Sequence, residues 1–430
     1  MEVIFQRGAL RGEIAVPGDK SISHRALFIA ASTQAKVRVQ NLNPGRDLDA
    51  TIGALSSIGA SAKRDGPDAE VQGGRLHAPE APVNCLNSGT TARLIMGTCA
   101  GAGLHARLQG DESLSSRPME PVAAQLRAFG SRVTTSGGAL PLEIAGQLPA
   151  QTRHFILLSA SAQIKSALLL AGVYSGTPVT LERCGGSRDH TERLLKSWNA
   201  DIVFDADRVA MRSAHIEPRD TRIPGDLSAA AFFLVAAVVT PGSRLTIRDV
   251  GINPSRSGLL DALLQMGARI EIGNRREWDC EPVADLSAEF SALRGITIDS
   301  SLTVRAIDEI VILSVAAAVA QGQTRIAGIS DLRGKESDRV AAIEQMLRSA
   351  GVATESDTNA IWITGGIPNA AGASVQTGGD HRTAMAAAAL GALCGPLEID
   401  DAACIDVSFP GFVPQWAAAQ NADRTIAELR

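Results

Sequence analysis

Two kinds of helical segment alternate along this chain of 430 residues. The first kind is amphipathic and ends at a glycine or asparagine, which favours the left-handed position just after a helix. Its instances lie about 70 to 85 residues apart, which is too far for a solenoid repeat but suits a unit of two helices and three or four strands. The segments are residues 54–59, 125–130, 194–199, 263–267 and 346–351.

The second kind of segment is an apolar, alanine-rich helix that opens on small polar or charged residues. Because these helices are apolar over most of their circumference, we expect them to be buried. The start of such a helix offers free N–H groups and the positive end of the helix dipole, which favour an anion. The alternative is that the polar residues are only the N-caps that every helix needs. The openings are residues 17–25, 87–93, 159–166, 225–229, 306–310 and 378–382.

Short β-branched stretches follow turns rich in glycine and proline, and this pattern predicts strands. Examples are residues 37–39, 179–181 and 245–247. Residues 273–291 are polar and irregular, and we expect an exposed loop there. The length of the chain favours two or three domains, and residues 224–226, Pro-Gly-Asp, are the best hinge candidate. The sequence therefore predicts an α/β protein of more than one domain.

The composition argues against several classes of function. The formal charge is −5 and aromatic residues make up 3% of the chain, so there is no case for a nucleic-acid partner. The six cysteines form no CxxC pair and have no histidine at metal-binding spacing, so we expect no metal and reduced thiols in a cytoplasmic protein. No signal peptide is visible, and the longest apolar run, residues 229–239, is too short to span a membrane.

Residues 17–25 hold the densest group of polar side chains before an apolar run. A Gly-Asp turn leads to a helix N-cap, and Lys20 and Arg25 add two cations at the same end. This arrangement suits a phosphate or carboxylate. A capped helix with solvated charges explains the stretch equally well.

A second dense cluster spans residues 332–339. Lys335 and Arg339 are four residues apart, so on a helix they share a face, with Glu336 beside them. The two cations could hold an anion. A salt-bridged, exposed helix start remains the alternative.

Three further places carry candidate chemistry. Arg382 could hold a carboxylate with its two-pronged guanidinium group, and His381 beside it could act as an acid or base. Asp308 precedes a strongly apolar helix and is a candidate general base, although helix capping explains it too. Arg117 and Arg188 lie near helix starts, and either could contact an anion or be a solvated arginine.

The sequence lacks a Ser/His/Asp nucleophile signature, a dinucleotide-binding GxGxxG motif and a P-loop. What remains is a set of Lys, Arg, Asp, Glu and His residues suited to anions. This set indicates transfer or elimination on small phosphorylated and carboxylated substrates, without a metal or a nucleotide.

Taken together, the clusters resemble the enolpyruvylshikimate-phosphate synthase family of enolpyruvyl transferases. Any one motif would be a weak signal, but they occur in the family's order between residues 17 and 410. The matching stretches are residues 18–25, 87–93, 161–166, 188–192, 335–339 and 380–382.

The resemblance implies two similar domains, each built from three βαβαββ units with buried parallel helices, an inside-out α/β barrel. It implies an N-terminal domain of residues 18–225, mainly on the shikimate-phosphate side. Residues 1–17 and 226–430 would form a C-terminal domain, mainly on the phosphoenolpyruvate side. The family places its active site in the cleft between the domains, which close over the substrates. It also implies a monomer with no cofactor.

The implied reaction belongs to the shikimate pathway of aromatic amino acid biosynthesis. A hydroxyl of shikimate 3-phosphate adds to phosphoenolpyruvate, and the tetrahedral intermediate then loses phosphate. Asp308 would take the hydroxyl proton, and Glu336 and Lys20 would donate a proton to the methylene carbon. His381 and Asn87 would support the site. The implied shikimate-phosphate contacts are Ser21, Arg25, Ser161, Gln163, Arg188 and Lys335, and the implied phosphoenolpyruvate contacts are Lys20, Gly89, Arg117, Arg339 and Arg382.

The sequence departs from the family's pattern at two positions. Val407 stands where a lysine is common, and Ala162 stands where many members have a serine. A related transferase that acts on a UDP-sugar is an alternative, but it uses a loop cysteine, and none lies between Cys99 and Cys184. An RNA-end cyclase would need a nucleotide site, which the low aromatic content fits poorly. A non-catalytic anion-binding homologue is the third alternative.

Overall fold

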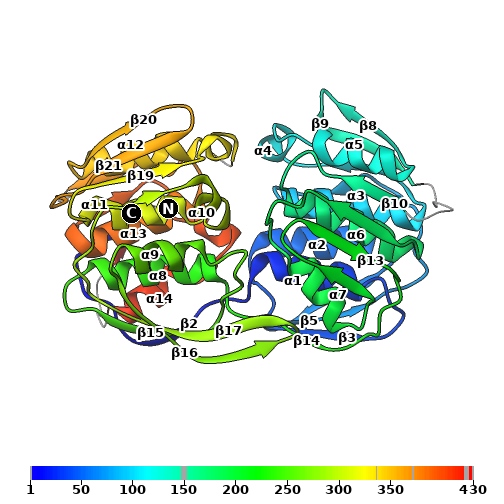
Figure 1. Ribbon diagram of the computed structural model, residues 1–430, viewed down its shortest axis with the longest axis horizontal. Helices are drawn as coiled ribbons and strands as arrows, with labels where there is room; N and C mark the ends of the chain where they lie inside the picture. The colour runs from blue at the N-terminus through cyan, green and yellow to red at the C-terminus, as the bar shows by residue number, and fades with distance from the viewer. Residues whose placement is uncertain (1, 147–152, 336, 370–371, 421–425, 429–430) are drawn as a thin grey trace. The chain divides into compact units, whose positions relative to one another are not determined.

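The helices and strands were assigned in a computed structural model of the chain (Figure 1). The residues that it describes are 2–146, 153–335, 337–369, 372–420 and 426–428.

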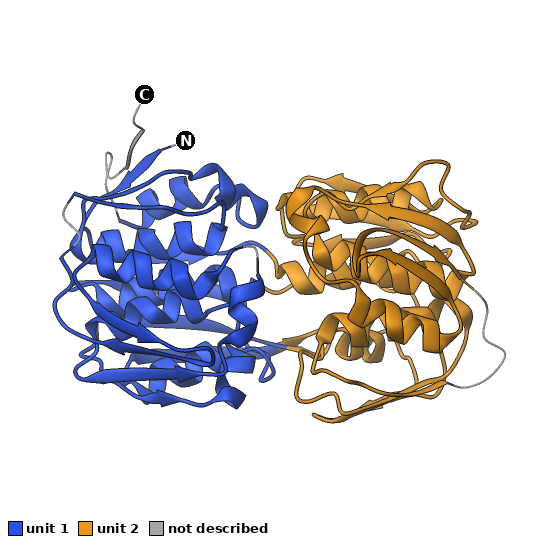
Figure 2. Ribbon diagram, turned by 90° about the horizontal axis from the view of Figure 1, so that it is seen from above, with its two compact units in different colours: residues 1–17, 225–276, 282–430 blue, residues 18–224, 277–281 orange. Residues whose placement is uncertain are grey.

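The chain divides into two units, which are coloured separately in Figure 2. It passes from one to the other after residues 17, 224, 276 and 281. Unit 2 comprises residues 18–224 and 277–281, and unit 1 comprises residues 1–17, 225–276 and 282–430.

Within the described residues of unit 2, the strands form three four-stranded sheets. In each sheet the first two strands are parallel and the other two pair antiparallel. In spatial order the sheets are β14 (Thr221–Arg222), β3 (Val37–Gln40), β5 (Asp68–Gln72) and β4 (Ser61–Asp65); β6 (Val83–Asn84), β7 (His105–Gln109), β9 (Ala139–Ala145) and β8 (Arg132–Ser136); and β10 (Arg153–Ile156), β11 (Val179–Glu182), β13 (Arg208–Met211) and β12 (Ile202–Phe204).

Unit 1 repeats this plan, again with three four-stranded sheets over its described residues. Each of these sheets also begins with a parallel pair. In spatial order they are β22 (Ala373–Val375), β23 (Leu397–Ile399), β1 (Val3–Phe5) and β24 (Ile426–Glu428); β18 (Thr297–Ile298), β19 (Gln323–Ala327), β21 (Ala360–Thr364) and β20 (Ala353–Ser356); and β2 (Arg11–Ala15), β15 (Arg244–Gly251), β17 (Glu281–Glu289) and β16 (Arg269–Trp278).

Two helices accompany each sheet, which confirms the predicted fold of βαβαββ units in two similar bodies. One helix of each pair is buried, and these are α1 (Lys20–Ala30), α3 (Gly89–Ala102), α6 (Ala162–Ser175), α8 (Leu227–Val239), α11 (Ile310–Val319) and α13 (His381–Cys394). The other helix of each pair has both buried and exposed residues, and these are α2 (Arg46–Ser57), α5 (Glu120–Phe129), α7 (His190–Ser197), α9 (Gly258–Gln265), α12 (Arg339–Ser349) and α14 (Phe412–Ala419). Shorter helical segments are α4 (Glu112–Ser115), α10 (Ser300–Arg305), η1 (Ser330–Gly334) and η2 (Ala403–Val407).

The predicted helix ends are confirmed by backbone geometry. The residue expected to end each amphipathic helix has a positive φ, the conformation that glycine and asparagine adopt most easily. These residues are Gly59, Asn199, Gly130, Gly267 and Gly351.

The prediction for residues 273–291 was wrong. They belong largely to the antiparallel strands β16 and β17. The alternation of side chains is hard to see because much of β16 is exposed, so polar residues occupy both of its faces. Residues 277–281, where the two strands meet, group with unit 2.

Each unit has its own apolar core, organised around its buried helices. In unit 2, α3 and α6 run so close that a Cβ atom on Gly97 would lie 2.2 Å from the carbonyl oxygen of Ala167. A Cβ atom on Gly101 would lie 2.3 Å from the carbonyl oxygen of Ala171. Gly97 precedes Gly101 along α3, and their partners Ala167 and Ala171 follow in the same order along α6, so the two helices are parallel. Among the described residues, none of the helices has both the length and the apolar character needed to cross a bilayer.

A series of buried hydrogen bonds connects three helices of unit 2. His24 Nδ1 on α1 lies 2.7 Å from Thr51 Oγ1 on α2, which lies 2.7 Å from Thr91 Oγ1 on α3. Thr91 donates in turn to Ser88 Oγ at 2.8 Å. Burial lowers the pKa of His24 to about 3, and the nearby cations Lys20 and Arg25 also lower it. The imidazole is therefore neutral at pH 7.

We predict that Gly97→Ala lowers the free energy of unfolding by about 1–3 kcal/mol, because the added methyl group must push two helix backbones apart. Gly53→Ala is the matched control, since Gly53 lies in α2 with nothing within 4 Å of its built Cβ. That change should be neutral or stabilise by roughly 0.5–1 kcal/mol. Urea denaturation measures both. Equal stabilities of the two variants would contradict the close packing.

We predict that His24 makes the free energy of unfolding decrease as the pH falls. Below pH 6.5 the unfolded chain takes up a proton on His24 that the folded chain refuses until about pH 3, so the free energy of unfolding declines over this window. The contribution approaches about 1.4 kcal/mol per pH unit. His24→Gln should flatten the pH dependence relative to wild type, whereas His77→Gln, at an exposed position, should not. Denaturation measured between pH 6.5 and pH 3 gives the free energy of unfolding at each pH. The same dependence of this free energy on pH in His24→Gln and wild type would refute this role.

Candidate functional site

The starts of the buried helices in unit 2 are tied together by hydrogen bonds. Arg25 on α1 is 3% exposed, and its Nε donates to Ser166 Oγ on α6 at 3.1 Å and to Thr191 Oγ1 on α7 at 2.9 Å. Its Nη1 donates to the carbonyl oxygen of Ser21 at 2.8 Å. The guanidinium group therefore fixes the first turn of α1 against α6 and α7, and the candidate residues Ser21 and Arg25 lie together there.

A second set of bonds joins the starts of α3 and α6. Gln163 accepts from Arg93 Nη1 at 2.9 Å and donates to Thr90 Oγ1 at 3.0 Å. A Cβ atom on Gly89 would lie 2.8 Å from Nη1 of Arg93 and 3.6 Å from Nη1 of Arg117, so both arginines border this glycine. Arg93 was not among the predicted site residues, although it lies inside the predicted motif 87–93.

Lys20 and Arg117 are both held by acidic or amide oxygens. Lys20 Nζ lies 2.9 Å from Asp47 Oδ2, and the lysine side chain is 20% exposed. Arg117 Nη2 donates to Asn87 Oδ1 at 2.6 Å, and Asn87 donates to Asp111 at 2.8 Å. Asn87 thus links Arg117 to Asp111. Asp47 was missed because its position on α2 carries no local signal.

The remaining predicted residues of unit 2 lie at helix starts. Ser161 caps α6, since its Oγ accepts from the backbone N–H of Ile164 at 3.4 Å. Arg188 is half-buried and lies two residues before α7.

In unit 1, the candidate residues converge on Asp308. Arg339 donates through Nε to Asp380 Oδ2 at 2.8 Å, and its Nη1 lies 3.7 Å from Asp308 Oδ1. Arg382 donates through Nη1 to the carbonyl oxygen of Asp308 at 2.7 Å, and its Nη2 lies 3.9 Å from Asp308 Oδ1. The carboxylate of Asp308 is 19% exposed, so two guanidinium groups border an acid that solvent or a ligand can reach.

Asp380 organises the start of α13. Its Oδ1 accepts from the backbone N–H of Arg382 at 2.8 Å, which caps the helix. Ser337 also donates to Asp380, at 3.1 Å, and His381 Nδ1 lies 4.0 Å from Asp380 Oδ1. The cap thereby holds Arg339 and places His381 at the same helix start.

The prediction that Lys335 and Arg339 share a helix face was wrong. Lys335 directly follows η1, and α12 begins only at Arg339, after its N-cap Asp338. The four-residue spacing therefore crosses a helix boundary. Glu336 lies outside the described residues. Val407 is the last residue of η2.

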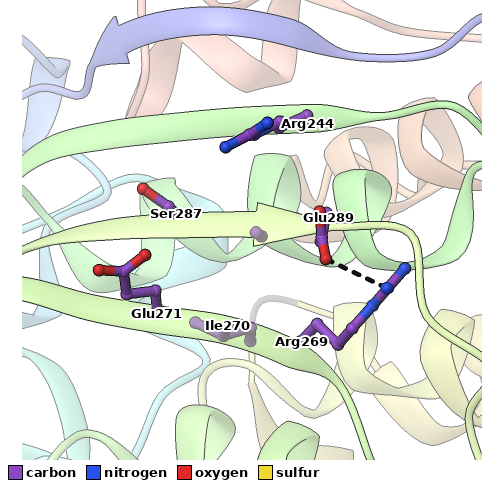
Figure 3. Close-up of a pocket in the computed structure, with 7 residues that line it drawn as sticks. Arg244, Arg269, Ile270, Glu271, Ser287 and Glu289 are labelled. Atoms are coloured by element: carbon purple, nitrogen blue, oxygen red, sulfur yellow. Dashed lines mark ion pairs between the residues drawn. The ribbon is translucent and has the colours of Figure 1, made fainter.

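A separate pocket lies on the sheet that contains β15, β16 and β17 (Figure 3). It has a volume of about 350 Å³, and within the described residues it includes no predicted site residue. Its lining residues lie on strands and range from exposed, such as Arg244 and Glu271, to buried, such as Ala288. Arg269 is paired to Glu289 at 3.2 Å. Across the described ranges, there is also no group of three or more His, Cys, Asp or Glu residues that could hold a metal ion.

Comparisons with known proteins identify the family of the chain. The family model described as EPSP synthase (3-phosphoshikimate 1-carboxyvinyltransferase) matches residues 4–416. A 3-phosphoshikimate 1-carboxyvinyltransferase of Gloeobacter violaceus is 43% identical over 421 residues, which cover 96% of this chain and 97% of that protein. One of Legionella pneumophila is 42% identical over 414 residues, covering 94% and 95%.

Solved structures give the same result. EPSP synthase from Acinetobacter baumannii matches with a TM-score of 0.87 and 33% identity over 99% of both chains. The enolpyruvyl transferase NikO from Streptomyces tendae shares the fold, with a TM-score of 0.79 and 20% identity over 99% of this chain and 98% of that one. These matches do not favour the UDP-sugar transferase as an alternative. The chain belongs to the EPSP synthase (3-phosphoshikimate 1-carboxyvinyltransferase) family.

Proposed function

We propose that this protein transfers the enolpyruvyl group of phosphoenolpyruvate to a hydroxyl of shikimate 3-phosphate and releases phosphate. This is the carboxyvinyl transfer of the shikimate pathway, which leads to chorismate and the aromatic amino acids. Family membership and near-complete coverage of the curated relatives support the proposal.

The observation that carries the chemistry is the environment of Asp308. Its carboxylate lies 3.7 Å from Arg339 Nη1 and 3.9 Å from Arg382 Nη2. Neighbouring guanidinium groups favour an ionised carboxylate, which is the form a general base must have. The same two arginines offer positive charge to the carboxylate and phosphate of phosphoenolpyruvate.

In the proposed reaction, the substrate hydroxyl oxygen forms a bond to C2 of phosphoenolpyruvate while Asp308 accepts the hydroxyl proton. The C2–C3 double-bond electrons take a proton at C3, from Lys20 or Glu336, which gives a tetrahedral intermediate. The bond from C2 to the phosphate oxygen then breaks, and loss of a proton from C3 restores the double bond. Water must be kept from the cation-like intermediate state, and fixed cations must balance the phosphate charges.

We assign the substrates to the two units by the distribution of candidate residues. In unit 2, Ser21, Arg25, Ser161, Gln163 and Arg188 are proposed contacts to shikimate 3-phosphate. Lys335 of unit 1 is proposed to join them. The proposed contacts to phosphoenolpyruvate are Lys20, Gly89 and Arg117 of unit 2 with Arg339 and Arg382 of unit 1, supported by Asn87 and His381.

The proposal includes a monomer that works in the cytoplasm. All six cysteines, each within the described ranges, are free thiols, and four of them are buried. This usage is typical of a reducing compartment. No cofactor is proposed, since the reaction needs only proton transfer and charge stabilisation.

Phosphate release tests the proposed function. Wild-type protein should release phosphate when phosphoenolpyruvate and shikimate 3-phosphate are both present, and not with either alone. Binding of both ligands by calorimetry without release would instead identify a non-catalytic homologue. Absence of binding would overturn the proposed substrates altogether.

Asp308→Ala should lower turnover by roughly 10²–10⁴-fold, because it removes the group that accepts the hydroxyl proton. Asp308→Asn should have a similar effect while preserving the shape of the side chain. Asp357→Asn, in an exposed turn of unit 1, provides the control and should turn over like wild type. Steady-state phosphate release measures all three, and activity of Asp308→Ala within a few-fold of wild type would remove Asp308 from this role.

A further inference from the structure

Glu309, which follows the proposed base, is a fully buried carboxylate. Its exposed fraction is 0%, and it occupies the N-cap position of α11 without capping the helix through its side chain. A buried carboxylate is costly unless other groups compensate its charge. Its surroundings in unit 1 therefore indicate what it does.

Glu309 is held by a series of buried hydrogen bonds among residues of α8 and of the segments before α8 and α9. Ser228 donates a short hydrogen bond from Oγ to Glu309 Oε1. Arg256 Nη2 donates to Ser228 Oγ at 2.7 Å and to Asp226 Oδ1 at 2.6 Å. Asp226, Ser228 and Arg256 are each at most 6% exposed. These contacts fix the position of the Glu309 carboxylate.

The same oxygen of Glu309 that accepts from Ser228 also lies near Arg382. Glu309 Oε1 lies 4.0 Å from Arg382 Nη1, the nitrogen that donates to the carbonyl oxygen of Asp308. Arg382 Nη2 lies 3.9 Å from the carboxylate of Asp308. The guanidinium group thus lies at nearly equal distances from two carboxylates, one near each terminal nitrogen, and makes no close two-pronged bond to either.

The contrast with Arg339 shows why this matters. Arg339 directs Nε and Nη2 at the two oxygens of Asp380, at 2.8 and 3.5 Å, so much of its two-pronged face is already used. An arginine engaged in this way with Asp308 would block the proposed base and lose donors for a ligand. A second carboxylate, near the other terminal nitrogen of Arg382, competes with such a pairing.

We propose that Glu309 is a positioning residue, which holds the Arg382 guanidinium away from a close pair with Asp308 and so keeps both available for phosphoenolpyruvate and proton transfer. Ser228 and Arg256 act through Glu309. The inference rests on the proposed function, because it takes Arg382 as a phosphoenolpyruvate contact and Asp308 as the base.

Glu309→Gln tests the inference by the direction of its effect. The amide keeps an oxygen that can accept from Ser228 but removes the charge. If Glu309 acted only as a negative charge near an anion site, its removal would strengthen phosphoenolpyruvate binding. If it positions Arg382, the guanidinium group should close onto Asp308, and the KM for phosphoenolpyruvate should rise about tenfold, with kcat falling as well. The KM for shikimate 3-phosphate should stay within about twofold of wild type.

Asp285→Asn is the matched control. Asp285 is also a buried carboxylate of unit 1, paired with Arg248 at 2.7 Å and Arg276 at 3.0 Å, but it lies on β17 outside the proposed site. Its loss should lower the melting temperature without changing the KM for phosphoenolpyruvate. Ser228→Ala is the second variant if Glu309→Gln does not fold, and it should raise the same KM by a smaller factor.

The outcomes are distinct. A higher KM for phosphoenolpyruvate in Glu309→Gln, absent in Asp285→Asn, supports the positioning role. An unchanged or lower KM in Glu309→Gln, or an equal rise in Asp285→Asn, overturns it while leaving the proposed function intact. Wild-type protein that releases no phosphate with both substrates overturns the proposed function, and this inference with it.

Discussion

The structure depends on helices that are buried over most of their length. Every residue of α8 is buried, and α3 and α6 approach so closely that only glycine fits at two contacts. A charged side chain in the middle of such a helix would cost several kcal/mol to bury. The charged side chains of these helices lie within the first two turns, and the N-terminal end is where free N–H groups and the dipole favour anions. Packing and anion binding thus have the same structural origin.

The cations at these ends are fixed by the protein itself. Arg25 is held by residues of three helices, and Arg339 is held by the buried cap Asp380. Such groups are oriented before any ligand arrives, so little reorganisation is needed when charge develops in a reaction. Within the part of the chain that the structure describes, Arg382 has no such close bond to a carboxylate, since its nearest carboxylate oxygens, those of Asp308 and Glu309, lie 3.9 and 4.0 Å away. The two kinds of arginine suit different tasks, since a fixed one defines the shape of a site and a less constrained one can meet a ligand.

The sequence predicted the parts of this fold that depend on local pattern. The buried helices and the glycine or asparagine ends of the amphipathic helices are confirmed, because periodicity and left-handed caps are local signals. The sheets draw strands from distant parts of the chain: β1 completes a sheet with β23 and β24, and β2 lies parallel to β15. No window of sequence reveals such pairings.

In the candidate site, too, the residues in local motifs were predicted and the long-range contacts were not. Asp308, Arg339 and Arg382 were selected from their motifs, and the structure brings them together. The hydrogen bond from Ser228 to Glu309 spans 81 positions, so sequence alone gave no reason to connect the two. The exposed strand β16 was mistaken for a loop because solvent on its surface permits polar residues where a buried strand would alternate.

Hydrogen–deuterium exchange with ligands tests most directly whether the helix starts are the binding sites. With shikimate 3-phosphate alone, we expect slower exchange of backbone amides at the starts of α1 and α6. Adding phosphoenolpyruvate should extend the protection to the starts of α12 and α13. Protection confined to other parts of the chain, such as the strands around Arg244 and Arg269, would contradict the account.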